Sequence, residues 1–218
     1  MSSNEKSDII IESLTVGPIQ TNVYVVGCVK TGVGAIVDAG GDAEGLLGLA
    51  EEHDLEIGLI LQTHAHIDHI AAIPQVKEAT GAPIYLHPED MMLWQAAPQQ
   101  AQMFNIPVGP LPAPDEELSD GQTIAIGELS AEVMLLPGHS PGSVAFYFAE
   151  QSVILSGDVL FAGSMGRVDL PGSDRNQMRA SLERLSTLPD DTQVLSGHGP
   201  ATSIGREKKL NPFFRQDW

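Results

Sequence analysis

The stretch Thr63-His64-Ala65-His66-Ile67-Asp68-His69 decides how this chain is interpreted, because it gathers three histidines and one aspartate within six positions. It follows a short apolar run over 57–61 that is typical of a buried strand. After it, residues 70–80 have the spacing of a helix that ends at a glycine. The motif is therefore expected in a loop between strand and helix, where side chains can point into a cleft.

The spacing inside this motif suits metal binding. In an extended segment alternate side chains point to the same side, so His64 and His66 can reach one ion. Asp68 and His69 lie where the chain turns into the helix, so they can serve a second ion a few ångströms away.

Three further polar residues end strand-like runs, and each lies beside glycine. They are His139 within 136–142, Asp158 after Ser156-Gly157, and His198 within Ser196-Gly197-His198-Gly199-Pro200. Imidazole and carboxylate ligands suit zinc, iron or manganese. A thiolate cluster is excluded, because the chain has a single cysteine.

The other candidate residues are assigned supporting or structural roles. His53 lies near the end of an expected helix, where a cation is favoured, and Cys28 is expected to be a small buried residue. Asp38, before Ala39-Gly40-Gly41, either forms a turn or supports a ligand histidine. His87 is structural or supports a ligand in the same way.

Composition bounds the class of protein. The chain has 218 residues, 42% of them hydrophobic, and a formal net charge of -18. One large domain with a true core is expected, and an acidic surface disfavours nucleic acid and anionic membranes as partners. Residues Met1 to Asp8 carry no secretory pattern and no apolar run reaches the ~20 residues of a spanning helix, so a cytoplasmic protein is expected.

The order of elements predicts two similar βα halves within one domain over 1–218. The first half covers about 9–96, a proline-rich connector or lid covers 97–117, and the second half covers 118–210 before a short basic and aromatic tail. Residues 91–114 are expected to pack against the body of the domain or to form an apolar wall over the cleft. Strands are expected over 9–16, 22–29, 34–38, 57–61, 83–86, 123–126, 131–136, 143–148, 152–156 and 192–195, and helices over 43–53, 70–80, 88–95 and 176–188.

These motifs resemble the metallo-β-lactamase superfamily, and within it most closely the glyoxalase II (hydroxyacylglutathione hydrolase) group. The matching stretches are 63–69, 137–142, 156–161, 197–200, 204–207 and 211–215. The resemblance implies an α/β fold, a four-layer αββα sandwich with a two-metal site at one edge.

The resemblance also implies the ligand set. His64, His66 and His139 would hold one divalent ion, Asp68, His69 and His198 a second, and Asp158 would bridge them. Zinc is the expected metal, with iron or manganese as alternatives. An aspartate at 158 and a histidine at 69 are further expected to distinguish the chain from true β-lactamases.

The activity implied is thioester hydrolysis by a metal-bridging hydroxide that Asp68 orients, with S-lactoylglutathione or a related hydroxyacyl thioester as the substrate. Arg167, Arg206 and Lys208 are the candidates for holding an anionic thiol carrier. Glyoxalase II continues beyond the Asn-Pro-Phe segment into a glutathione-binding extension, whereas only 216–218 follow the matching stretch here.

Two alternatives remain open at this point. Residues 166–174 also resemble the persulfide dioxygenases, which would use His64, His139 and Asp158 around one Fe(II). A lactonase needs only the same hydroxide. A small-molecule substrate is expected in every case, and the sequence predicts no oligomeric state.

Overall fold

Two six-stranded β-sheets lie face to face at the centre of the computed structural model, which describes residues 8–214 and 218. The first sheet has its strands in chain order, antiparallel from β1 to β3 and parallel from β3 to β6. Its strands are β1 (Ile9–Val16), β2 (Thr21–Cys28), β3 (Val33–Val37), β4 (Glu56–Leu61), β5 (Ile84–Leu86) and β6 (Glu116–Glu117).

The second sheet has the order β14-β13-β10-β9-β8-β7, and only β10 and β13 pair in parallel. Its strands are β7 (Thr123–Ile126), β8 (Leu129–Leu135), β9 (Val144–Phe148), β10 (Val153–Gly157), β13 (Gln193–Ser196) and β14 (Thr202–Ser203). A short ribbon of β11 (Leu160–Phe161) and β12 (Ser164–Met165) follows β10.

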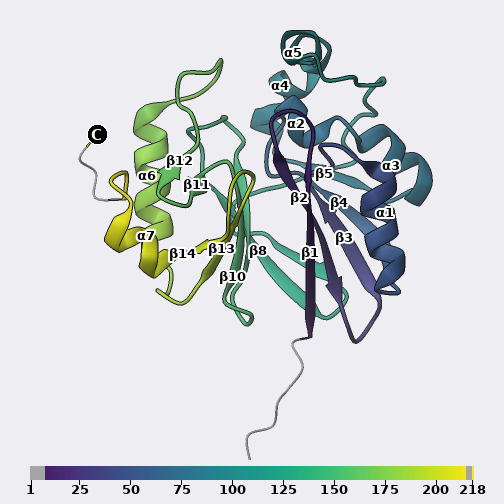
Figure 1. Ribbon diagram of the computed structural model, residues 1–218, viewed down its shortest axis with the longest axis horizontal. Coiled ribbons are helices and arrows are strands. Elements are labelled where there is room, and N and C mark those ends of the chain that lie inside the picture. Colours follow the sequence, from purple (N-terminus) through teal and green to yellow (C-terminus); the bar gives the residue numbers. More distant parts are fainter. Residues whose placement is uncertain (1–7, 215–217) are drawn as a thin grey trace, which may run out of the picture.

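Helices cover the outer faces of both sheets, which confirms the expected αββα sandwich (Figure 1). Helices α1 (Ala43–Glu52) and α3 (Ile73–Thr80) cover the first sheet, and α6 (Arg175–Ser186) and α7 (Ile204–Leu210) cover the second. At one end of the first half lie α2 (Ile67–Ile70), the 3-10 turn η1 (Pro88–Asp90), α4 (Met91–Gln95) and α5 (Ala97–Phe104).

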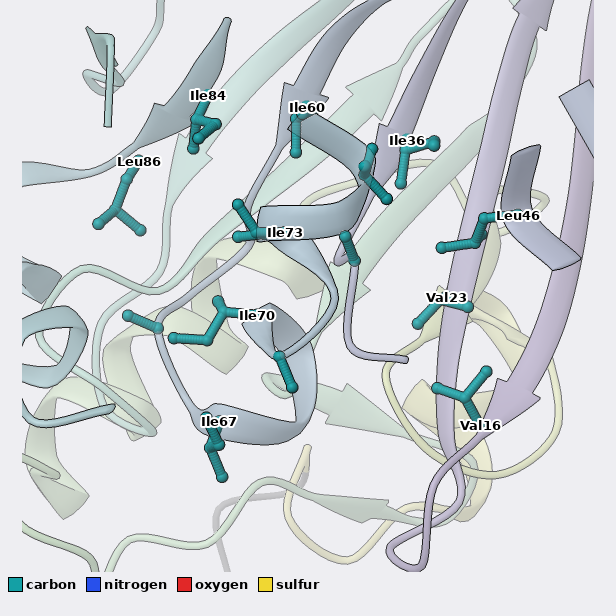
Figure 2. Packing of buried hydrophobic residues seen from close by; sticks show 14 of the residues in the cluster. Val16, Val23, Ile36, Leu46, Ile60, Ile67, Ile70, Ile73, Ile84 and Leu86 are labelled. Atoms are coloured by element: carbon teal, nitrogen blue, oxygen red, sulfur yellow. The ribbon is translucent and has the colours of Figure 1, made fainter. Parts of the chain in front are cut away.

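Strand β2 shows how the layers form. Val23 and Val25 point to the helices, whereas Tyr24, Val26 and Cys28 point to the second sheet. A strand covered on both faces reads as a continuous apolar run rather than an alternating one. The helix-facing cluster, in which Val23 lies near Leu46 of α1, is shown in Figure 2.

The structure corrects three sequence expectations. The helix expected over 70–80 begins only at Ile73, as α3, with Pro74 in its first turn, where it needs no amide donor. A separate short helix, α2, precedes it and ends at Ile70. The connector over 97–117 begins with the eight-residue helix α5, whose Pro98 likewise lies in the first turn. The second half ends with helix α7, which was not expected from the sequence and whose first turn is capped by Ser203.

Within the described ranges 8–214 and 218, no helix has the length and apolar character needed to cross a membrane. The expectation drawn from Met1 to Asp8 falls almost entirely outside the described residues, as does Arg215 of the matching stretch 211–215.

Candidate metal centre

The seven side chains singled out in the sequence converge at one edge of the sandwich. His64 and His66 lie in the loop after β4, and Asp68 and His69 lie in α2. From the second half, loops after β8, β10 and β13 supply the other three, His139, Asp158 and His198. Both halves of the sandwich are therefore needed to build the centre.

The first group of donors is His64, His66 and His139, whose ligand atoms lie within 4.8 Å of one another. The Nδ1 atom of His66 and the Nε2 atom of His139 are 2.8 Å apart. The Nε2 atom of His64 is buried and has no hydrogen-bond partner among the described residues. A buried lone pair without a partner is costly, and a metal ion would satisfy it.

The second group is Asp68, His69 and His198, again with ligand atoms within 4.8 Å of one another. Asp68 Oδ2 lies 3.5 Å from His69 Nε2 and 3.4 Å from His198 Nε2. The Nε2 atom of His69 is also buried without a hydrogen-bond partner in the described part of the chain.

The Asp158 carboxylate lies between the two groups. Its Oδ2 is 3.5 Å from His139 Nε2 and 3.3 Å from His198 Nε2, and its Oδ1 is 3.4 Å from His69 Nε2. One carboxylate thus faces donors of both groups, which is the position that a bridging ligand requires.

Hydrogen bonds to the outer ring nitrogens orient the histidines. The Thr63 hydroxyl donates its single proton to Asp38 Oδ2 (2.7 Å), so the His64 Nδ1–H donates to Thr63 Oγ1 (3.0 Å). His69 Nδ1 faces Asp38 Oδ2 at 2.9 Å. When either ring is neutral, as metal binding requires, its Nε2 lone pair therefore faces the centre.

The same arrangement holds in the second half. His139 Nδ1 faces the Arg167 carbonyl oxygen at 3.0 Å, and His198 Nδ1 faces that of Gln20 at 3.2 Å. A carbonyl oxygen only accepts, so Nδ1 carries a proton in both rings. Nε2 is the atom that would bind a cation, in His198 once the second ring proton has left.

Asp38 satisfies both roles left open by the sequence. Its backbone has φ of 60°, and its carbonyl oxygen accepts a hydrogen bond from the Gly40 N–H (2.7 Å), which closes a tight bend after β3. Its carboxylate accepts hydrogen bonds from the Thr63 N–H and hydroxyl and from His69. With its oxygens already occupied, Asp38 orients two ligand histidines rather than adding a ligand.

Electrostatics divide the two groups in the metal-free protein. Burial lowers the pKa of His64 well below its usual range and that of His66 to about 3. For His69 and His198 burial also acts to lower the pKa, but the carboxylates of Asp68 and Asp158 outweigh it and raise the values to about 9 and about 10. The second group thus holds protons that a cation would replace.

The donors fit a resident metal. They are imidazole nitrogens and carboxylate oxygens, and buried atoms of both kinds lack hydrogen-bond partners in the described ranges, including Asp158 Oδ1. This donor set suits zinc, iron or manganese.

Two residues that support the centre were not found by sequence reasoning. The fully buried Asp90 accepts hydrogen bonds from the Ala65 N–H, the Ser140 hydroxyl and the Gly142 N–H. It thereby ties the loop of His64 and His66 to the loop of His139. Thr21, the other residue, donates to Asp68 Oδ2 at 2.7 Å. No spacing rule marks either contact, because each joins segments far apart in sequence.

Close backbone approach explains one of the glycines beside the ligands. A Cβ atom at Gly197 would lie 2.1 Å from Asp158 Oδ1 and 2.8 Å from His69 Cε1. Only glycine lets the loop that carries His198 come this near to the Asp158 carboxylate.

A cavity of about 520 Å³ opens over the centre. Its floor is formed by ligands, and its walls come from the β1–β2 turn, α4, α5 and the 161–171 region. The wall residues are Ile19, Leu93, Ala96, Gln99, Gln100, Met103, Phe104, Phe161, Arg167, Leu170 and Pro171. The 91–114 segment therefore does both things foreseen for it, since Trp94 and Ala97 pack into the core while Met103 and Phe104 face the cavity.

The basic residues expected to hold a substrate are dispersed. Arg167 lines the cavity, but it forms a two-bond ion pair with Asp169. Arg206 pairs with Glu207, and Lys208 pairs with Asp190. Neither Arg206 nor Lys208 lines the cavity. The structure thus does not bring the three basic side chains together.

His53 and His87 lie outside the centre. His53 is the C-cap residue of α1 and lies 3.5 Å from Glu12. His87 accepts a hydrogen bond from the Glu89 N–H at the start of η1. Both have local structural roles.

Comparison with known proteins agrees with this geometry. The family model described as Metallo-beta-lactamase superfamily matches residues 16–198. Hydroxyacylglutathione hydrolase GloC of Haemophilus influenzae is 39% identical over 182 residues, which cover 82% of this chain and 86% of that protein.

Two solved structures superpose over nearly the whole chain. The structure of TTHA1623 in a di-iron-bound form has a TM-score of 0.84 and 41% identity, covering 93% of this chain and 99% of that one. The structure of BLEG-1 B3 metallo-beta-lactamase has a TM-score of 0.84 and 39% identity, covering 94% and 99%.

Proposed function

This chain belongs to the metallo-beta-lactamase superfamily and is a metallo-hydrolase of it, and from that premise we propose that it cleaves thioesters with two metal ions. The observation that carries the two-metal part is the position of Asp158, which faces donors of both groups. His64, His66 and His139 would hold one ion, and Asp68, His69 and His198 the other. Zinc is the proposed metal, with iron or manganese as the alternatives.

Bound divalent cations supply a water of lowered pKa and polarise a carbonyl group. The chain's own residues then position the reactants. Thr21 fixes Asp68 through Oδ2, which leaves Oδ1 to accept a hydrogen bond from the attacking water and orient it. The water oxygen bonds to the carbonyl carbon, the carbon–sulfur bond breaks, and a carboxylic acid and a thiol result.

The apolar walls assist this reaction. Leu93, Met103, Phe104 and Phe161 line the cavity above the centre. A substrate covering these side chains would displace water from around its carbonyl group, which strengthens electrostatic interactions at the centre. A thiolate is a good leaving group, so a general acid is not required. This suits a thioester better than an amide.

The name of the Haemophilus relative makes S-lactoylglutathione, or a related hydroxyacyl thioester, the first substrate to test. We propose assays of the zinc-loaded protein with S-lactoylglutathione, a neutral thioester, a lactone and a cephalosporin. The cephalosporin is included because one structural neighbour is the BLEG-1 B3 metallo-beta-lactamase. Thioester turnover at least tenfold above that of the lactone and the cephalosporin is expected.

The variant Asp158→Asn tests whether Asp158 joins two metal sites, because it removes the negative charge that faces both donor groups. Bound metal, measured by elemental analysis, is expected to fall from two ions to one or fewer, with loss of turnover. Asp174→Asn is the matched control, since Asp174 is an exposed helix cap and asparagine caps equally well. Two ions retained in Asp158→Asn, or a lactone or cephalosporin preferred by the wild type, would overturn the proposal.

An iron-dependent persulfide dioxygenase is the second candidate, favoured by the 166–174 stretch, part of which lines the cavity. It would use His64, His139 and Asp158 around one iron. The second donor group has no use in that reaction. Oxygen uptake with glutathione persulfide, together with a content of one iron per chain, would establish it instead.

A further inference from the structure

We propose that the cavity selects thioesters whose acyl group is neutral and apolar, and that it disfavours glutathione as the thiol part. The acyl group would lie on a wall formed by α4, α5 and the β1–β2 turn. The inference rests on the proposed hydrolysis and narrows its substrate class. The acyl group would lie against Ile19, Leu93, Met103 and Phe104 while its carbonyl reaches the centre.

The wall is apolar and open to solvent. Met103 is 77% exposed, Phe104 39% and Ile19 37%, and these are three of the six large hydrophobic side chains exposed in the described ranges. Met103 and Phe104 follow Gln99 and Gln100 at spacings of three to four residues, so one face of α5 is turned to the cavity. Apolar side chains that gather around a cavity mouth indicate a ligand-binding surface.

Gln100 fixes this face relative to the ligand loop. Its Oε1 accepts from the Ile67 N–H (3.0 Å), and its Nε2 donates to the carbonyl oxygens of Leu93 (2.8 Å) and Ala65 (3.3 Å). Since Ala65 and Ile67 flank His66, the wall is held at a set position beside the metal ligands. Its amide groups are thereby occupied by protein partners, so Gln100 adds little polarity to the wall.

Charge disfavours an anionic carrier at the same place. Apart from ligand histidines, Arg167 is the one cationic side chain lining the cavity within the described residues, and Asp169 neutralises it. The formal net charge of -18 repels anions further. Glutathione carries two carboxylates, which would find no free cation on this wall.

The test compares N-acetylcysteamine thioesters with acetyl, butyryl and hexanoyl groups, using zinc-loaded protein. Each added methylene is expected to raise kcat/KM about two- to fourfold. Hexanoyl-N-acetylcysteamine is expected to exceed S-lactoylglutathione about tenfold or more. Equal kcat/KM along the series, or preference for S-lactoylglutathione, overturns the inference while leaving thioester hydrolysis intact.

The double variant Met103→Ser and Phe104→Ser should remove the chain-length dependence, with kcat/KM for the hexanoyl thioester falling to within about twofold of the acetyl value and kcat/KM for the acetyl thioester changing less than about twofold. Leu210→Ser is the control, because Leu210 is also a large exposed hydrophobic side chain but lies outside the cavity. A dependence that survives the double variant contradicts the assignment of the wall.

Calorimetry separates this inference from the proposed reaction. The S-hexyl thioether of N-acetylcysteamine cannot be hydrolysed, and it should bind at least tenfold more tightly than the S-ethyl thioether, with or without zinc. If no thioester is hydrolysed but this affinity ratio is observed, the proposed reaction is wrong and the assignment of the apolar wall is supported. If the affinity ratio is near one, the assignment of the apolar wall is wrong.

Discussion

Replacing Asp90 by asparagine should weaken the first metal site without unfolding the protein. Asp90 Oδ1 accepts from the Gly142 N–H (2.6 Å), and Oδ2 accepts from the Ala65 N–H and the Ser140 hydroxyl (both 2.8 Å). An asparagine has the same shape but offers only one acceptor oxygen. In either orientation its amide NH₂ would face a backbone N–H.

The magnitude follows from that one unmade bond. A buried donor left without an acceptor costs about 1–3 kcal/mol, so we expect about 2 kcal/mol lost from the free energy of unfolding of the metal-free protein. The donor left without its bond belongs to the loop of His64 and His66 or to that of His139. Zinc affinity at the first site should therefore fall about 10- to 100-fold, as for other residues that orient ligands.

Two measurements test this. Urea unfolding of metal-free Asp90→Asn should show a midpoint about 1 M lower, and zinc calorimetry should show one site weakened with the other within about threefold. Asp174→Asn again serves as the control, because that exposed carboxylate also accepts backbone N–H groups. Wild-type stability together with wild-type affinity at both sites would refute the reasoning.

Three further predictions concern the same centre. Gly197→Ala places a Cβ atom 2.1 Å from Asp158 Oδ1, so bound metal should fall below two ions per chain. Gly48→Ala is the control and should keep both ions, because the space around Gly48 is open. Equal metal content in the two variants would contradict the packing argument. The raised pKa values of His69 and His198, about 9 and about 10, stabilise the metal-free fold fully below pH 6.5, and this contribution is lost as the pH rises toward those values. The urea midpoint should therefore fall less between pH 7 and pH 9 in His198→Gln than in the wild type, and parallel curves would show that His198 is not charged. Zinc binding at pH 7 should release protons from these two rings, so calorimetric enthalpies should differ between buffers of unlike ionisation heat; identical enthalpies would exclude the release.

Local patterns predicted much of this molecule. The strand runs and the glycine-flanked ligands were evident because alternation, helical spacing and turn residues act over a few positions. For the same reason, the spacing within 63–69 was enough to predict that the polar side chains of this motif lie close together. Placing His139, Asp158 and His198 beside it required the family resemblance, since the residues alone do not specify which strand ends meet.

Contacts between distant segments could not be predicted in this way. Asp90 reaches a backbone amide 52 positions away, and such a carboxylate leaves no periodic signal. Arg206 and Lys208 were predicted to hold an anionic carrier, but they lie outside the cavity and pair with Glu207 and Asp190. Charge alone does not reveal such intramolecular partners. The split between α2 and α3 was missed because Pro74 was not used as a helix-start signal.

The division of the ligands between the two halves has a consequence for the biogenesis of the protein. A chain that has folded only its first sheet presents His64, His66, Asp68 and His69, and it lacks the donors that close either site. We therefore expect tight capture of metal to follow docking of the second sheet, as the last step of maturation. The cation installed would then depend on the metals available at that moment as well as on the affinity of the finished centre.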